Sequence, residues 1–325
     1  MKNEPLVSMI TYCYNGARFV SNYFEAILKQ TYSNIELIFF NNGSEDKTGD
    51  IAESYRKPLE DKGVKVNIIH YSENQSTCEL KQKAFQMMNG EYFFGCDSDD
   101  FIDPTYIEEM TEYLVSHSDK GIVYCQLRVV QEETGEVLSV MKMTPRYKDK
   151  EAFEDILCGT NINFTSISYM MSKRHFEQVN PTKSIYNSRY GENYQVQMPF
   201  LYHNLQGYIE KPLGQYTVRR DNYSSKLSDP KKRYEALKGQ EKSVLATLMQ
   251  IQPDNIEYYE KFFLSRIRRE LFYTALFWND ALAVQESYSE LKQIRSTSVK
   301  EKMSFMLSKM GLFLTISNLK DKFKK

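Results

Sequence analysis

The first hundred or so residues alternate short apolar runs with segments in which apolar residues recur every three or four positions. The apolar runs predict buried strands at 6–12, 35–40, 64–70 and 92–96, and the periodic segments predict helices at 18–30, 48–55, 80–88 and 107–114. A strict alternation of strand and helix is typical of a mostly parallel sheet with helices on both faces. The fold class predicted is therefore α/β and Rossmann-like.

The second half of the chain changes character along its length. A hairpin is predicted around Thr134 and Gly135, and two short helices follow, at 153–157 and 172–179. Beyond about residue 229 the pattern becomes long and amphipathic, which predicts a helical region. We expect three parts: a ligand-binding half at 1–110, the rest of the α/β domain at 111–228, and a helical part at 229–325.

Polar side chains cluster where the predicted parallel strands end. These clusters are Tyr14-Asn15, Asn41-Asn42 and the run from Asp97 to Asp100. Ligands of parallel sheets bind at the carboxyl ends of the strands. The sequence therefore predicts one pocket to which all three turns contribute.

Asp97-Ser98-Asp99-Asp100 carries the sharpest chemical signal. Carboxylates two residues apart at a strand end can hold a hard divalent cation and leave positions for phosphate oxygens. An EF-hand loop is excluded because Phe101 and Ile102 occupy positions that need a ligand and a glycine. The alternative is a solvated acidic turn that caps the next helix.

Composition narrows the class of protein. The 325 residues include 42 Lys and Arg against 43 Asp and Glu, a net charge of −1, so we predict no nucleic-acid partner. Five widely spaced cysteines without a Cys-x-x-Cys pair argue against a disulfide framework or structural zinc. Neither a leader segment nor a run long enough to span a membrane is evident, which predicts a cytoplasmic protein.

Four stretches, taken in order, resemble the motifs of family 2 glycosyltransferases, which have the GT-A fold. They are VSMITYCYN at 7–15, LKQTY at 28–32, IFFNNGSEDKT at 38–48 and NGEYFFGCDSDD at 89–100. Each stretch alone is weak, but their order and spacing are specific. The resemblance covers about the first 110 residues.

The resemblance implies a nucleotide-sugar donor, with a UDP-sugar favoured, and inversion at the anomeric carbon. It implies that Asp97 and Asp99 bind Mn²⁺ or Mg²⁺, which would neutralise the leaving diphosphate. The residues implied in donor binding are Thr11, Tyr12, Tyr14, Asn15, Asn42, Ser44, Lys81, Asp97, Ser98, Arg219 and Arg220.

The chain departs from the family pattern at three of its motifs. Asn42 stands where an acid is commoner, and Lys81 stands where an arginine would give a bidentate contact to phosphate. The segment at 190–195 resembles the family's Glu-Asp motif, but the second acid is Asn193. Glu192 is then the candidate general base; the alternative is that it only caps the following helix.

Two basic segments leave alternatives open. Arg219 and Arg220 could close over the diphosphate or lie in a solvated loop. Residues 300–325 hold seven lysines and two acids, with Met303, Met306 and Met310 at helical spacing. Such a helix can lie on the inner face of an anionic membrane as a peripheral contact, or pack internally with a solvated lysine face.

Together with these residues, the resemblance implies a metal-dependent inverting glycosyltransferase that acts on a glycan or lipid-linked acceptor, in the manner of surface or capsular polysaccharide enzymes. The first alternative, motivated by Asn193, is a nucleotide-sugar-binding protein with weak or no transfer. A nucleotidyltransferase ranks last, because the first strand is not followed by a glycine-rich phosphate loop.

Overall fold

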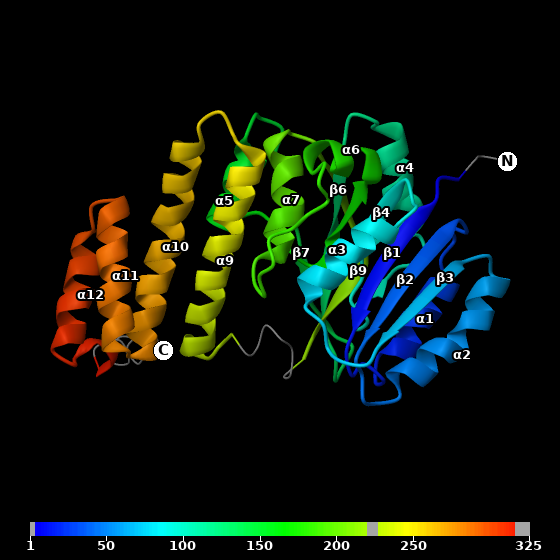
Figure 1. Ribbon diagram of the computed structural model, residues 1–325, viewed down its shortest axis with the longest axis horizontal. Helices are drawn as coiled ribbons and strands as arrows, with labels where there is room; N and C mark the ends of the chain where they lie inside the picture. The colour runs from blue at the N-terminus through cyan, green and yellow to red at the C-terminus, as the bar shows by residue number, and fades with distance from the viewer. Residues whose placement is uncertain (1–3, 220–226, 316–325) are drawn as a thin grey trace. The chain divides into compact units, whose positions relative to one another are not determined.

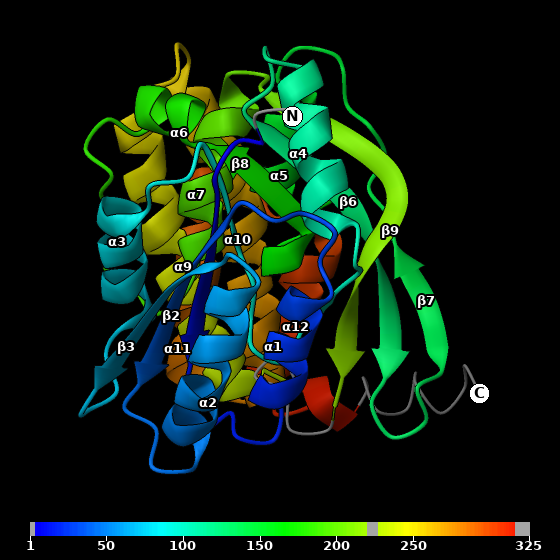
Figure 2. The same cartoon turned by 90° about the vertical axis from the view of Figure 1, so that its right-hand side faces the viewer.

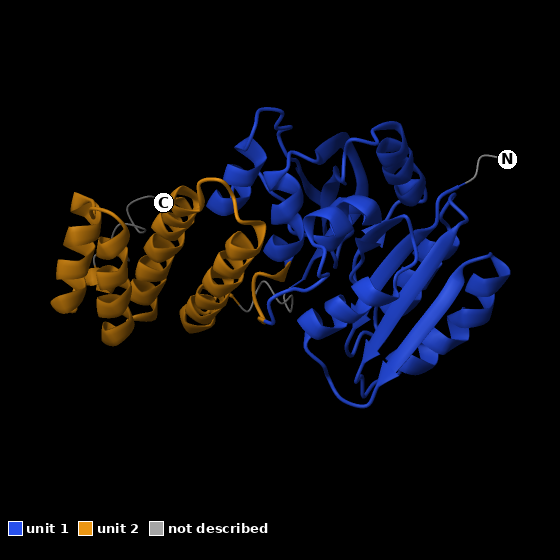
Figure 3. Ribbon diagram, turned by 45° about the horizontal axis from the view of Figure 1, so that its top comes forward, with its two compact units in different colours: residues 1–187, 193–219 blue, residues 188–192, 220–325 orange. Residues whose placement is uncertain are grey.

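The computed structural model describes residues 4–219 and 227–315, and these residues form two compact units (Figure 3). The first unit comprises residues 1–187 and 193–219. The second comprises residues 188–192 and 220–325.

Strands and helices alternate through the first unit, and the elements that the structure describes in the second unit are helices (Figure 1). The strands are β1 (Val7–Cys13), β2 (Ile35–Asn42), β3 (Lys65–Tyr71), β4 (Tyr92–Gly95), β5 (Phe101–Ile102), β6 (Ile122–Gln131), β7 (Val137–Met141), β8 (Tyr169–Ser172) and β9 (Gln206–Val218). The helices are α1 (Val20–Leu28), α2 (Thr48–Asp61), α3 (Thr77–Met87), α4 (Tyr106–Ser116), α5 (Glu151–Cys158), α6 (Lys173–Val179), α7 (Glu192–Tyr202), α9 (Pro230–Ile251), α10 (Ile256–Trp278), α11 (Ala281–Ile294) and α12 (Val299–Lys309).

A single sheet organises the first unit. Within the described residues it has nine strands, in the order β3-β2-β1-β4-β8-β6-β9-β5, with β7 paired to β6. The pairs β1–β2, β2–β3 and β1–β4 are parallel, which confirms the predicted α/β fold class. β8 runs antiparallel to both β4 and β6, while β6 and β9 are parallel.

Helices cover both faces of the sheet, so successive residues of a central strand are both buried. Phe94 points toward α4, where its ring lies 5.0 Å from that of Tyr106. Its neighbour Phe93 points to the other face, with ring centroids 5.3 Å from Phe176 of α6. Figures 1 and 2 show α1 and α2 on one face and α3 on the other.

The predicted hairpin at 121–141 is confirmed as β6 and β7, and the predicted helices of the C-terminal region as α9, α10 and α11. The longest strand, β9, mixes two glycines, a proline and a lysine with few apolar residues, so its sequence alone does not mark its bounds. Among the described helices, none has both the length and the apolar character that a membrane span requires.

Candidate functional site

The acidic turn follows β4, a central strand of the sheet. The backbone amide of Cys96 donates to the Ile10 carbonyl of β1 at 2.9 Å, so the chain stays in register with β1 until it reaches Asp97. The amide of Asp100 then donates to the Asp97 carbonyl at 3.0 Å and closes the turn. Three carboxyl groups are thereby gathered at the carboxyl edge of the parallel strands.

The three carboxyl groups have different surroundings. Asp97 is exposed, and its carboxylate accepts a hydrogen bond from the Ser166 hydroxyl at 3.5 Å. Asp99 forms an ion pair with the Arg219 guanidinium. Asp100 is buried, and burial together with the charges of Asp97 and Asp99 raises its pKa well above the usual range. Asp97 and Asp99 are therefore the carboxylates that a cation from solvent can reach.

The loops after β1 and β2 are bonded to each other, as the sheet topology requires of neighbouring parallel strands. The amide of Asn15 donates to the Ser44 hydroxyl at 3.0 Å, and the Asn15 side-chain carbonyl accepts from the amide of Glu45 at 2.9 Å. The amide of Gly16 donates to Thr48 at 2.8 Å. Two predicted donor-binding residues, Asn15 and Ser44, therefore lie side by side.

The aromatic residues predicted to bind the donor's base differ in exposure. Tyr14 is 51% exposed at the tip of the loop, and Tyr12 stacks on Phe40 with ring centroids 5.5 Å apart. Thr11 is fully buried, and its hydroxyl donates to the Cys96 carbonyl at 2.8 Å. This hydrogen bond connects Thr11 of β1 to Cys96, the residue that directly precedes the acidic turn.

Asn42 is bonded through both ends of its amide to one backbone unit. Its side-chain oxygen accepts from the Gln75 amide at 2.7 Å, and its nitrogen donates to the Gln75 carbonyl at 3.1 Å. A carboxylate could accept the first bond but could not donate the second. This pairing gives a physical reason for asparagine at a position where the family pattern has an acid.

Lys81 of α3 meets the start of α7 through a second bridging amide. The Lys81 ammonium donates to the Asn193 side-chain oxygen at 3.1 Å. The Asn193 nitrogen donates to the Phe164 carbonyl at 2.9 Å. Phe164 lies two residues before Ser166, which contacts Asp97, so this chain of contacts connects Lys81 to the acidic turn.

Arg219 lies at the end of β9 and reaches two residues of the site. Besides pairing with Asp99, its guanidinium carbon stands 4.2 Å from the centre of the Phe19 ring. A cleft of about 310 Å³ opens beside this contact, in the size range of ligand pockets, about 300–1,000 Å³. Its lining includes Phe19, Asn22, Phe101, Gln131, Gln215 and Thr217. The other predicted arginine, Arg220, lies outside the described residues.

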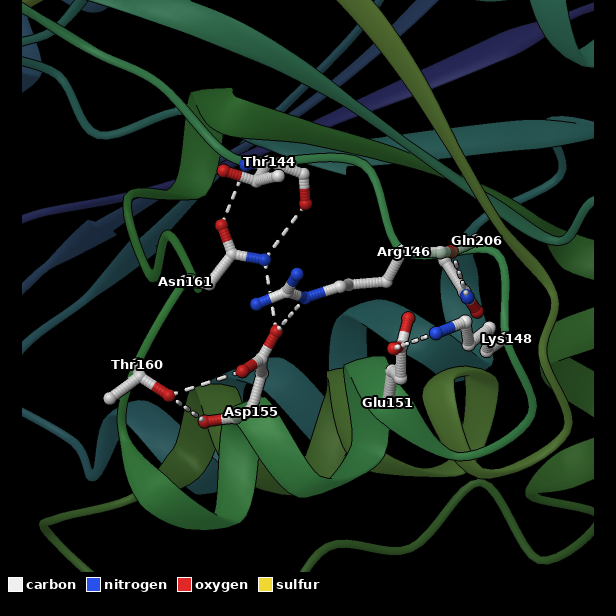
Figure 4. A network of polar contacts seen from close by, with 8 residues as sticks. All are labelled: Thr144, Arg146, Lys148, Glu151, Asp155, Thr160, Asn161 and Gln206. Carbon is white, nitrogen blue, oxygen red and sulfur yellow. Dashed lines mark hydrogen bonds and ion pairs between the residues drawn. The ribbon is translucent and has the colours of Figure 1, made fainter.

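A polar network fixes the segments that enter and leave α5 (Figure 4). Arg146 pairs with Asp155 at 2.6 Å, and the Asn161 amide donates to the same carboxylate at 2.9 Å. Asn161 also bonds the backbone of Thr144, accepting from its amide at 2.6 Å and donating to its carbonyl at 2.8 Å. The network anchors the chain three residues before Phe164 and so supports the part of the site that Phe164 and Ser166 form.

Two further residues were predicted to act in the site, Ser98 in donor binding and Glu192 as the general base. Ser98 is half-buried in the acidic turn and bonds the Cys13 thiol, whose pKa burial raises to about 11. Glu192 is the first residue of α7 and is grouped with the second unit. Sequence reasoning missed Phe19, Phe164 and Ser166, which lie in stretches without a motif. Only the fold brings Phe19 to Arg219, Phe164 to Asn193 and Ser166 to Asp97.

Within the described residues, no group of three or more His, Cys, Asp or Glu side chains could hold a metal ion by itself. Asp97 and Asp99 offer carboxylate oxygens, the donor type that Mg²⁺ and Mn²⁺ prefer. Sites of that kind often use one or two carboxylates and take further ligands from substrate phosphates. The donor set therefore fits a metal that binds together with a nucleotide.

Curated proteins share sequence with part of the chain. EpsH of Bacillus subtilis, named provisionally as a glycosyltransferase, is 36% identical over 134 residues, 41% of this chain and 37% of EpsH. An uncharacterized glycosyltransferase of Rickettsia typhi is 35% identical over 149 residues, 46% of this chain and 44% of that protein. The chain thus matches less than half the length of these relatives.

The fold is also similar to that of solved structures. Staphylococcus aureus TarS in complex with UDP-GlcNAc aligns with a TM-score of 0.61 and 16% identity over 89% of this chain and 82% of TarS. At this identity the likeness concerns the fold, and it agrees with the predicted GT-A architecture. The sequence model described as "Glycosyl transferase family 2" matches residues 8–179. Because this match covers more than half of the residues of the chain, the chain belongs to glycosyl transferase family 2.

Proposed function

We propose that the protein is a metal-dependent inverting glycosyltransferase that moves a sugar from a nucleotide-sugar to a hydroxyl of a glycan or lipid-linked acceptor. The observation that carries this proposal is the acidic turn at the carboxyl edge of the sheet. Asp97 and Asp99 stand there beside the joined loops of Asn15 and Ser44. A UDP-sugar is the donor we favour, because the TarS complex contains UDP-GlcNAc and has the same fold.

Asp97 and Asp99 would hold Mn²⁺ or Mg²⁺, and the bound ion would neutralise negative charge on the leaving diphosphate. The complex of a Pyrobaculum calidifontis mannosyltransferase with GDP-Man and Mn²⁺ supports this part of the proposal at the level of fold, with a TM-score of 0.52. Arg219 now neutralises Asp99. We propose that its guanidinium turns to the diphosphate when a donor binds.

The acceptor hydroxyl needs a base, and we propose that Glu192 is that base. Asn193, at the position of the family's second acid, cannot take a proton, and both ends of its amide are bonded. Glu192 is the adjacent acid at the start of α7. Inversion requires one carboxylate on the acceptor side, because the hydroxyl attacks the anomeric carbon directly while losing its proton.

Calorimetry with UDP and with a panel of UDP- and GDP-sugars, with and without Mn²⁺, tests the donor site. We expect UDP binding that depends on metal and is lost in an Asp97→Ala/Asp99→Ala variant. A Glu60→Ala/Asp61→Ala variant removes two exposed acids of the same unit and should bind as the wild type does. A folded protein that binds no nucleotide, or an Asp97/Asp99 variant that binds UDP normally, would contradict the donor site.

The role of Glu192 is tested separately, as UDP release with an acceptor that supports turnover. Glu192→Gln keeps the shape of the side chain but cannot accept a proton. We expect it to bind UDP normally and to turn over about 10²–10⁴-fold more slowly. Turnover at the wild-type rate would show that Glu192 is not the base. A wild type that binds the donor but transfers nothing would favour the alternative, a nucleotide-sugar-binding protein without efficient transfer.

Contact with a membrane, predicted for residues 300–325, is a separate proposal. The described part of that segment includes most of α12.

A further inference from the structure

The helix α12 has one face packed and the opposite face apolar and exposed. Its packed face carries Glu301 and Ser304, which are 2% and 7% exposed, and Phe305, whose ring stacks on Tyr288 of α11 at 4.0 Å. Val299, Met303, Met306 and Met310 are 73%, 58%, 64% and 66% exposed. Their spacing of four, three and four residues places them in one stripe along the helix.

The helix is held in this orientation by its first turn. Ser298 and Glu301 form a capping box, and the Glu301 carboxylate also pairs with Arg295 at 2.6 Å. These contacts bury the acidic group of α12 and point the stripe away from α11. The apolar stripe is therefore fixed by the packing of the helix, and α12 could not hide it without breaking the capping box and the Tyr288–Phe305 stack.

The exposed charges of α12 itself are of one sign. Lys300, Lys302 and Lys309 are exposed on α12, and Glu301 is its single acid. A helix with an exposed apolar stripe between lysines is the pattern of segments that lie in the interface of an anionic bilayer. Methionine suits a fluid partner because its side chain is unbranched and flexible.

A second copy of the chain fits this surface less well. An eleven-residue helix is about 17 Å long, so a stripe one side chain wide buries a few hundred Å² at most. Standard protein interfaces bury about 800 Å² on each partner. Adsorption to lipid has no such minimum, because apolar burial and the attraction of each lysine to anionic headgroups add side chain by side chain.

We propose that the exposed face of α12, formed by Val299, Met303, Met306 and Met310 with Lys300, Lys302 and Lys309, docks the protein on an anionic membrane surface. The methionines enter the boundary between headgroups and acyl chains, and the lysines contact lipid phosphates. This inference does not depend on the donor site, since it uses neither Asp97, Asp99 nor Glu192. A failure of one proposal is therefore distinguishable from a failure of the other.

Sedimentation with lipid vesicles tests the proposal on the full chain. We expect binding to vesicles of equal parts phosphatidylglycerol and phosphatidylcholine, and little binding to phosphatidylcholine alone. Met303→Gln/Met306→Gln/Met310→Gln should weaken binding at least about tenfold. Lys300→Gln/Lys302→Gln/Lys309→Gln should weaken it at low salt, with a smaller difference at high salt.

The matched control is Leu282→Gln, which removes an apolar side chain that is 73% exposed on α11, next to Glu286 and Glu290. It should bind vesicles as the wild type does. All substituted side chains are exposed, so thermal unfolding should stay near that of the wild type. The proposal is overturned by a wild type that does not bind anionic vesicles, or by a methionine variant that binds equally well. It is also overturned by a wild-type dimer in solution that the methionine variant converts to a monomer.

Discussion

The Asn193 amide is bonded at both ends, and each bond needs a different half of the amide. Its oxygen accepts from the Lys81 ammonium at 3.1 Å, and its nitrogen donates to the Phe164 carbonyl at 2.9 Å. A carboxylate could replace the first half only, because it has no donor when ionised. Asn193 therefore joins α3 and α7 to the segment from Phe164 to Ser166, which contacts Asp97. Asn42 likewise uses both its oxygen and its nitrogen, to bond the backbone of Gln75.

This bridge gives a prediction at the scale of one residue. Asn193→Ala removes both bonds and should lower the free energy of unfolding by about 1–3 kcal/mol. Asn193→Asp should cost a similar amount, since it sets a second oxygen against the Phe164 carbonyl. Urea unfolding at neutral pH measures both losses. A double-mutant cycle with Lys81→Met should give a coupling of at least about 0.5 kcal/mol; an Asn193→Asp variant as stable as the wild type would contradict the bridge.

At the scale of the element, Glu36 joins three parts of the sheet. It lies in β2, yet it is 8% exposed, and its carboxylate accepts from the Ser8 hydroxyl of β1 at 2.6 Å. It also accepts from the amide of Asn89 at 2.9 Å and from the Asn89 side chain at 2.7 Å, in the turn before β4. The carboxylate thus holds the amino ends of β1, β2 and β4 at the edge opposite the acidic turn.

The Glu36 bonds predict a pH dependence of stability. Burial alone would raise the pKa of this carboxyl, but the hydrogen bonds from Asn89 and Ser8 outweigh it and lower the pKa below its ordinary value. The stabilisation is therefore complete above the ordinary pKa, about 4.3, and is lost as the pH falls through the lower pKa of the folded state. Glu36→Gln should cost about 1–3 kcal/mol at neutral pH and less in acid. Urea unfolding of the wild type and the variant at neutral and at acidic pH measures the two losses. An equal loss of stability at the two pH values would contradict the role of the Glu36 carboxylate.

The elements also show what sequence patterns can and cannot reach. Strands β1 to β4 were predictable because each is a short apolar run followed by a polar turn, and their parallel pairing follows from the helices between them. The bounds of β9 are not set by a local pattern, because the strand is held by pairing with β6, some eighty residues earlier. The turn of Asp97 and Asp99 was predictable for the same reason as β4, because it is the polar turn that directly follows an apolar run. The contacts of Arg219 with Asp99 and of Asn193 with Lys81 cross more than a hundred residues, and only the folded sheet brings them together.

At the scale of the whole molecule, each unit has its own buried centre. In the second unit Phe263, Ile267 and Leu271 are fully buried on α10. Beside them the Arg268 guanidinium donates to the Glu241 carboxylate at 2.8 Å and also pairs with Glu290 of α11. Burial raises the pKa of Glu241, so its charged form depends on the nearby cations Arg268 and Lys238. This cluster of ion pairs, in which Glu241 is buried and Arg268 and Glu290 are half-buried, connects α9, α10 and α11.

The two centres predict independent responses to substitution. Arg268→Ala leaves the buried Glu241 without its guanidinium partner and should lower the stability of the second unit by about 3–5 kcal/mol. Glu36→Gln acts in the first unit, and substitutions that share no partner add to within about 0.5 kcal/mol. Scanning calorimetry of the wild type, both single variants and the double variant should therefore show two transitions, each moved by one substitution only. UDP, if bound in the first unit as proposed, should raise the transition that Glu36→Gln lowers and leave the other in place. A single transition that both substitutions lower would mean that the two units unfold as one.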